Sequence, residues 1–144
     1  MGKNVNAIEV AQALRVSVGM LSRRLRQRTD DDDLTLPQST ALARLDRGGP
    51  MTSSDLARQE RISAQSMGAT LAGLEARGLV ARRADPDDGR RIVMSITPAG
   101  RREMGNRRDA RTARMAAGLV GFSEVELAQL LAVAPLIERL AESI

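Results

Sequence analysis

Guanidinium groups are the side chains of this sequence with the clearest capacity to bind a ligand. The segment 82–91, RRADPDDGRR, places a pair of arginines on each side of a turn made of aspartate, proline and glycine. Every basic side chain of the chain except Lys3 is an arginine. Guanidinium forms bidentate hydrogen bonds with phosphate oxygens and with the edge of guanine, so this segment favours a phosphate-bearing ligand.

The residue types that most enzymes use are missing. The chain has no His and no Cys, which removes the commonest general base, the thiol nucleophile and the thiolate metal ligands. It has no Trp or Tyr and a single Phe, so it lacks an aromatic surface on which single-stranded bases would stack. We predict that the chain is not an enzyme and that it has no catalytic residue, no cofactor and no metal site.

The length of 144 residues and the absence of a linker rich in Pro, Ser or Gly predict a single domain over residues 1–144. The first residues, MGKNVNAIEVAQALRV, lack the apolar core and cleavage site of a signal peptide. No apolar run reaches the roughly 18 residues of a membrane span. We therefore expect a cytoplasmic protein without a membrane partner.

Two helices near the ends of the chain carry apolar residues at alternating spacings of three and four. The first helix is expected over 6–28. The last helix is expected to begin after a cap at Ser123, and it belongs to the C-terminal segment 98–144. The stripes are Ala11, Leu14, Val18, Leu21 and Leu25, and then Leu127, Leu130, Ala134, Ile137, Ala141 and Ile144. Because so small a monomer cannot bury both, we predict that 6–28 and 98–144 form a homodimer interface; an intramolecular helix pair is the alternative.

The segment 35–97 predicts a winged helix-turn-helix. Short helices are expected from Pro37 to the glycines at 48 and 49, from Thr52 to about residue 60, and from Ser63 to Gly78. Two strand-like runs, LVARR and RIVMSIT, follow on either side of ADPDDGR. The fold class is therefore mainly α with a small β-hairpin: a winged helix-turn-helix with N- and C-terminal dimerisation helices.

The stretch from 48 to 101 resembles the MarR (multiple antibiotic resistance regulator) family of bacterial transcription factors. The most specific pieces are LEARGLVARRADPDDGR and the exit SITPAG, and the terminal helices extend the resemblance over nearly the whole chain. The resemblance implies a homodimer whose terminal helices form the two-fold interface. It also implies DNA-binding lobes and, often, a small anionic or phenolic effector in the crevice between interface and lobes.

The helix from Ser63 is expected to enter the major groove of double-stranded DNA. At 100° per residue its inner face holds Met67, Leu71 and Leu74, and its outer face holds Gln65, Gly68, Ala69 and Ala72. Gln65 would contact adenine, Ser66 a base or phosphate, and Ala69 a thymine methyl group. The family usually carries a basic residue near position 69, so base reading here is expected to be sparse. Gly68 either lets DNA approach closely or merely tolerates exposure.

The wing is expected to read the minor groove. In the MarR family the arginine that matches Arg90 enters this groove, where A·T-rich tracts concentrate negative potential. Asp88 matches the family's wing aspartate and is expected to hold the hairpin by an ion pair with Arg90 or Arg77. The predicted DNA-binding residues are Ser63, Gln65, Ser66, Ala69, Arg82, Arg83, Asp88, Arg90 and Arg91.

An effector carboxylate would need a cation beside apolar walls. On that basis we predict an effector site formed by Arg15, Val18, Met104 and Arg108.

Together these features predict a dimeric regulator that binds a palindromic operator, represses nearby genes and is released by a small molecule. An architectural protein that coats DNA with weak sequence preference is the alternative, because the outer face of the recognition helix is nearly bare. A third hypothesis is that the winged helix serves only for contacts with other proteins.

Overall fold

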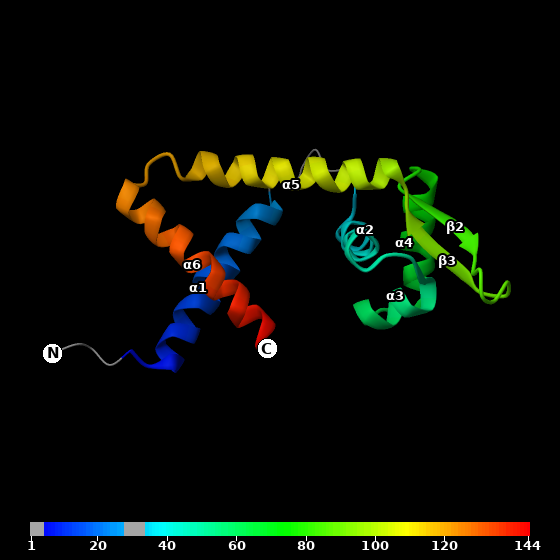
Figure 1. The fold of residues 1–144 in the computed structure, drawn as a ribbon, viewed down its shortest axis with the longest axis horizontal. Coiled ribbons are helices and arrows are strands. Elements are labelled where there is room, and N and C mark those ends of the chain that lie inside the picture. The colour runs from blue at the N-terminus through cyan, green and yellow to red at the C-terminus, as the bar shows by residue number, and fades with distance from the viewer. Residues whose placement is uncertain (1–4, 28–33) are drawn as a thin grey trace. The chain divides into compact units, whose positions relative to one another are not determined.

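The structure is a computed structural model that describes residues 5–27 and 34–144 (Figure 1). Its elements are α1 Ala7–Gln27, α2 Leu36–Gly48, β1 Met51–Thr52, α3 Ser53–Glu60, α4 Ala64–Ala76, β2 Val80–Ala84, β3 Ile92–Ile96, α5 Pro98–Gly118 and α6 Glu124–Glu142. They divide into two compact units, residues 1–108 and 109–144, with the boundary inside α5. The mainly α fold with a small antiparallel sheet is confirmed. Arg28, the last residue of the first predicted helix, lies outside the described residues, and the predicted domain boundaries stay predictions.

Local hydrogen bonds explain where the helices of the structure begin. The hydroxyls of Thr52, Ser63 and Ser123, which stand at predicted helix starts, each accept a backbone N–H three residues further on. α2 begins one residue earlier than predicted, because Thr35 and Gln38 form a reciprocal capping box there. Helix starts with a hydroxyl cap are therefore visible in the sequence to within about one residue.

The three strands form one antiparallel sheet in the order β1-β3-β2. In the β2–β3 hairpin, Arg82 lies opposite Met94 and Arg83 lies opposite Val93. The hairpin is the one that the sequence predicts. β1 is an addition, with Met51 paired to Met94. Its two residues are too few to show an alternating pattern, so the sequence does not reveal it.

One hydrophobic core, to which Leu34 also contributes, fills the lobe, the name used below for residues 35–97. Its buried members are Leu34, Ala41, Leu42, Leu45, Leu56, Ala57, Met67, Leu71, Leu74, Leu79, Val80, Met94 and Ile96. The three residues predicted to face inward from the helix that starts at Ser63, Met67, Leu71 and Leu74, are among them. Full burial of one Leu or Met side chain contributes about 1.5–3 kcal/mol. The core therefore fixes α2, α3, α4 and the sheet relative to one another.

The start of α5 is attached to the turn between α4 and β2. The Thr97 hydroxyl donates to the carbonyl of Gly78 at 2.6 Å and accepts the N–H of Gly100 at 3.1 Å. A Cβ at Gly100 would lie 2.2 Å from the carbonyl oxygen of Leu79. Glycine at position 100 therefore permits the close approach of α5 to this turn.

The apolar side chains of α1 and α6 are largely uncovered. Val18 and Leu21 in the predicted stripe of α1 are exposed, and so is every residue from 121 to 144, which includes the whole of α6. Both predicted helices are confirmed, whereas the dimer interface stays a prediction. Within residues 5–27 and 34–144, no helix is both long and apolar enough to cross a bilayer.

Candidate nucleic-acid interface

α4 presents one face to the core and a small, exposed face to its surroundings. The buried residues are Met67, Leu71 and Leu74, and the exposed ones are Gln65, Gly68, Ala69 and Ala72, as predicted. An added Cβ at Gly68 would meet nothing within 4 Å. Packing within the chain therefore does not require glycine there, and this face admits the close approach of another molecule.

The two predicted serines lie together at the start of α4. Ser63 Oγ accepts the N–H of Ser66 at 3.0 Å and donates to the hydroxyl oxygen of Ser66 at 2.9 Å. Both residues are exposed. The Ser66 hydroxyl hydrogen is not used in these two bonds, so it can donate to an acceptor outside the chain.

A tight turn joins α3 to α4. Arg61 adopts the left-handed conformation with a φ of 55°. Its N–H donates to the carbonyl of Arg58 at 3.3 Å, and the N–H of Ile62 donates to the carbonyl of Ala57 at 3.0 Å. Because α3 and α4 also share the core, this connection has the form of a helix-turn-helix.

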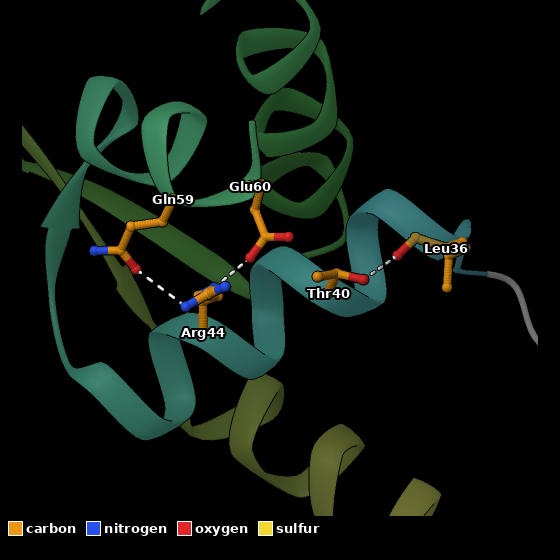
Figure 2. Close-up of polar contacts among 5 residues, drawn as sticks. All are labelled: Leu36, Thr40, Arg44, Gln59 and Glu60. Atoms are coloured by element: carbon orange, nitrogen blue, oxygen red, sulfur yellow. Dashed lines mark hydrogen bonds and ion pairs between the residues drawn. The ribbon is translucent and has the colours of Figure 1, made fainter. Parts of the chain in front are cut away.

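A polar cluster holds the end of α3 against α2 (Figure 2). Nε of Arg44 contacts the carboxylate of Glu60, and Nη1 of Arg44 donates to Oε1 of Gln59 at 3.3 Å. The Glu60 side chain is only 17% exposed, so its charge needs a nearby partner. We refer to these three residues as the Arg44 clamp. Sequence reasoning missed it, because Arg44 and Glu60 are 16 positions apart and share no local pattern.

Backbone hydrogen bonds shape the tip of the wing. The N–H of Asp85 donates to the carbonyl of Arg91 at 2.8 Å, and the N–H of Arg91 donates to the carbonyl of Asp88 at 3.0 Å. Oδ1 of Asp88 accepts the N–H of Arg90 at 3.1 Å. The sequence predicted an ion pair for Asp88, whereas its contact here is with the main chain of Arg90. The aspartate thus closes the turn, and Arg90 is exposed at the tip.

Two arginines of the wing contact acidic side chains of the helix-turn-helix. Nε of Arg82 lies 3.0 Å from Oε2 of Glu75 in α4. Nη2 of Arg91 lies 3.8 Å from Oδ2 of Asp55 in α3. Sequence reasoning gave neither Asp55 nor Glu75 a role at this site. Arg82 and Arg91 therefore differ in surroundings from the two other wing arginines.

The structure does not bring the four predicted effector residues together at one described cavity. Arg15 and Val18 are exposed on α1, Arg108 is exposed on α5, and Met104 packs against the core of the lobe. An open hollow beside α1 is lined instead by Glu9, Gln12, Ala13, Val16, Ser17, Met20, Leu21 and Arg24. The effector site stays a prediction.

The lobe offers hydrogen-bond donors and guanidinium groups for a ligand, together with exposed carboxylates. In the part of the chain that the structure describes, no cluster of three or more His, Cys, Asp or Glu side chains is arranged to hold a metal ion. The exposed groups of α4 and the wing include hydroxyl, amide and guanidinium groups, which bind phosphates and base edges, beside the carboxylates of Asp87 and Asp88.

Comparison of the sequence finds relatives among transcriptional regulators. A model described as MarR family matches residues 32–91. An HTH-type transcriptional regulator of Mycobacterium bovis is 37% identical over 91 residues, which are 63% of this chain and 64% of the relative. An HTH-type transcriptional repressor of the same organism is 37% identical over 68 residues, 47% of this chain and 49% of the repressor. The matches thus span less than two thirds of these relatives.

Comparison of the fold extends the similarity to nearly the whole chain. A crystal structure labelled as a transcriptional regulator from Pseudomonas aeruginosa has a TM-score of 0.80 and 34% identity, and the match covers 97% of this chain and 98% of that one. A MarR family protein from Bacillus stearothermophilus shares the fold with a TM-score of 0.73 at 21% identity over 99% of each chain.

A mutant of S. aureus MepR bound to an oligodeoxyribonucleotide also shares the fold, with a TM-score of 0.66 at 21% identity over 94% of this chain and 98% of that one. The named relatives are transcriptional regulators, which are not enzymes, so the prediction that the chain is not an enzyme is confirmed. The match to the family model and the identity to the P. aeruginosa protein over almost its full length show that the chain belongs to the MarR family.

Proposed function

We propose that the chain is a homodimeric regulator of transcription that binds double-stranded DNA at a palindromic operator. One observation carries this proposal: the exposed small face of α4 and the exposed Arg90 at the wing tip belong to one lobe with a common core. In a winged helix-turn-helix, the second helix of the motif enters the major groove and the wing lies beside it. The oligonucleotide bound to the MepR mutant, which shares the fold, supports the same use of the lobe.

The residues of α4 and the wing have separate roles in this proposal. Gln65 binds an adenine edge, and Ala69 packs on a thymine methyl group. Ser63 and Ser66 donate to phosphate or base. Arg90 enters the minor groove, where a narrow A·T-rich tract attracts guanidinium.

The dimer forms through α1 and α6. Apolar side chains on both helices are exposed in the single chain, among them Val16 at 54% and Leu131 at 77%. Contact with a second copy would remove this surface from water. Each Å² of apolar area that is buried stabilises the dimer by about 25 cal/mol. Light scattering at micromolar concentration is expected to give twice the chain mass of 15.5 kDa. A monomer would exclude the two-fold model.

The regulator acts as a repressor in the cytoplasm and is released from DNA by a small anionic or phenolic molecule. The name of one relative, a transcriptional repressor, supports repression. In this proposal Arg15 and Arg108, which are exposed, supply the cations for the effector, and Val18 and Met104 supply apolar contacts. Benzoate and phenol serve as probes. Either one should release DNA from the parent protein, and the same concentration should release a smaller fraction of the DNA from Arg15→Ala. If neither probe changes DNA binding, the effector site loses its support.

A second candidate is an architectural protein that coats DNA, and the bare outer face of α4 favours it. Footprinting on a genomic fragment that contains the promoter of the neighbouring gene separates the two functions. One bounded, two-fold symmetric protected site is the outcome expected of a regulator. Uniform protection that grows with protein concentration would reject the regulator in favour of the architectural role, and no protection would reject both.

A further inference from the structure

We propose that Asp55 and Glu75 are positioning residues that hold the wing against the helix-turn-helix. Glu75 acts on β2 through Arg82, and Asp55 acts on the start of β3 through Arg91. The proposal rests on the function proposed above, because it divides the wing arginines into those that hold the wing and those that bind DNA.

The two ion pairs reach β2 and the residue directly before β3 from two different helices. Glu75 of α4 lies 3.0 Å from Arg82 on β2. Asp55 of α3 lies 3.8 Å from Arg91, which directly precedes β3. Oδ1 of Asp55 also accepts a hydrogen bond from Arg58 at 3.0 Å, which orients the carboxylate on α3. A hairpin that is held both at β2 and at the entry to β3 rotates less against α3 and α4 than one held at a single point.

The strand register directs neighbouring arginines to opposite faces of the hairpin. Arg82 lies opposite Met94, which is buried, so both belong to the face that packs on the core. Arg83 lies opposite Val93 on the other face. Because side chains alternate along a strand, Arg83 points away from α4 when Arg82 points toward it. The strand register therefore places Arg82 on the side of Glu75 and Arg83 on the opposite face of the hairpin.

Arg83 and Arg90 are the wing arginines that bind DNA in this proposal. Both are exposed. Among residues 5–27 and 34–144, neither guanidinium forms an ion pair or a hydrogen bond, whereas those of Arg82 and Arg91 do. A guanidinium that pairs with no carboxylate keeps its hydrogen-bond donors available for a phosphate.

If Asp55 and Glu75 position the wing, their loss changes DNA binding in a different way from the loss of two negative charges. A carboxylate near DNA repels phosphate, so removal of its charge alone raises the affinity for every duplex. A carboxylate that positions the wing has another effect: its loss lowers the affinity for a preferred sequence relative to other sequences. The ratio of the two affinities therefore distinguishes positioning from charge.

The expected effect is modest, because both pairs are partly exposed. Asp55 and Glu75 have side chains that are 35% and 39% exposed. Pairs with this exposure shift a local equilibrium by up to about fivefold. The wing is thus expected to lose part of its preferred orientation, not its fold.

The test uses the full chain and two duplexes of equal length. One duplex is selected from a random pool by the parent protein, and the other has the same bases in scrambled order. Asp55→Asn and Glu75→Gln are compared with Glu103→Gln, which removes the same charge from a pair with Arg107 in α5. We expect each wing variant to lower the affinity ratio by about two- to fivefold. Glu103→Gln should leave the ratio unchanged, and Asp55→Glu, which keeps the charge, should restore part of it.

Hydrogen exchange of the free protein gives a second readout that does not involve DNA. The N–H groups of Asp85 and Arg91 donate within the wing tip. They should exchange up to about fivefold faster in Asp55→Asn and Glu75→Gln, and at the parent rate in Glu103→Gln. Global destabilisation would lower binding to both duplexes equally and would not change the ratio.

The proposal requires both effects. Unchanged exchange in the two wing variants overturns it, and so does an affinity ratio that changes equally in all three variants. If the parent protein selects no duplex from the pool, the proposed function fails, while the exchange rates still decide whether Asp55 and Glu75 hold the wing.

Discussion

Arg44 in α2 binds Glu60, the last residue of α3, directly before the left-handed Arg61 that starts the turn to α4 (Figure 2). The Arg44 clamp thus joins the first helix of the lobe to the turn that orients the recognition helix. Gln59 supports it as the second acceptor. Since Glu60 is mostly buried, the clamp also supplies the positive charge that its carboxylate needs.

Arg44→Met should therefore lower the free energy of unfolding by about 1–2 kcal/mol, because it leaves the Glu60 carboxylate without its partner. Arg47→Met is the matched control: it removes the same charge from an exposed position of the same helix. The urea midpoints of both variants give the comparison. Equal shifts would mean that the clamp contributes nothing beyond net charge.

Gly100→Ala should destabilise the fold although alanine is the better helix former. Its Cβ would lie 2.2 Å from the carbonyl oxygen of Leu79, so α5 would have to move away from the turn. Overpacking of this kind costs about 1–3 kcal/mol. Gly105→Ala, in the same helix, meets nothing within 4 Å and should stabilise by up to about 1 kcal/mol. Thermal unfolding measures both, and a stabilised Gly100→Ala would refute the close approach.

The parts of the fold that sequence reasoning predicted correctly depend on local signals. The cap at Ser123 rests on a serine and a glutamate three residues apart, and the hairpin turn rests on adjacent aspartate, proline and glycine. The inner face of α4 follows from the helical repeat alone. What the sequence did not reveal depends on residues brought together by the core, such as the bond from Thr97 to Gly78.

The same distinction applies to the candidate site. The exposure of Gln65 and Ala69 was predictable, because an amphipathic helix shows which face is buried. The different surroundings of Arg82 and Arg83 were not, although the two are adjacent. Their surroundings depend on the strand register and on where α4 places Glu75, and neither is encoded in a local pattern.

The contribution of the capping box at the start of α6 to the stability of the fold should depend on pH. The Ser123 N–H donates to Oε2 of Glu126 at 2.8 Å, and this bond, together with the Ser123 hydroxyl, lowers the pKa of Glu126. A carboxyl group with a lower pKa in the folded state stabilises the fold above its unfolded pKa, about 4.3. That contribution is lost as the pH falls through the folded pKa.

Glu126→Gln keeps an acceptor, as Gln38 does in the box of α2, but removes the charge. The difference in the free energy of unfolding between parent and variant should therefore shrink as the pH falls below about 4.3. Urea denaturation at several pH values measures it. A difference that stays constant over this range would show that the charge of Glu126 is irrelevant to the cap.

Ala69→Arg should raise the affinity for DNA of any sequence. It adds a cation to the outer face of α4, where the structure shows small exposed side chains. One further phosphate contact per chain increases the salt dependence of binding by about 0.9 in the logarithmic slope. Ala110→Arg adds the same charge to an exposed position of α5 and serves as control. If both variants raise the affinity and slope equally, α4 has no privileged contact with DNA.

Arg90→Ala should weaken binding to the selected duplex by about 1–3 kcal/mol and lower the salt slope by about one per chain. The fold should persist, because Asp88 binds the backbone N–H of residue 90, which alanine retains. Arg82→Ala provides the contrast: its guanidinium pairs with Glu75, so its loss should reduce sequence preference more than salt dependence. Binding isotherms at several salt concentrations, with both duplexes, measure these quantities. If Arg90→Ala binds like the parent protein while Arg82→Ala fails to bind, the wing acts through its stem and the assignment of Arg90 to the minor groove is wrong.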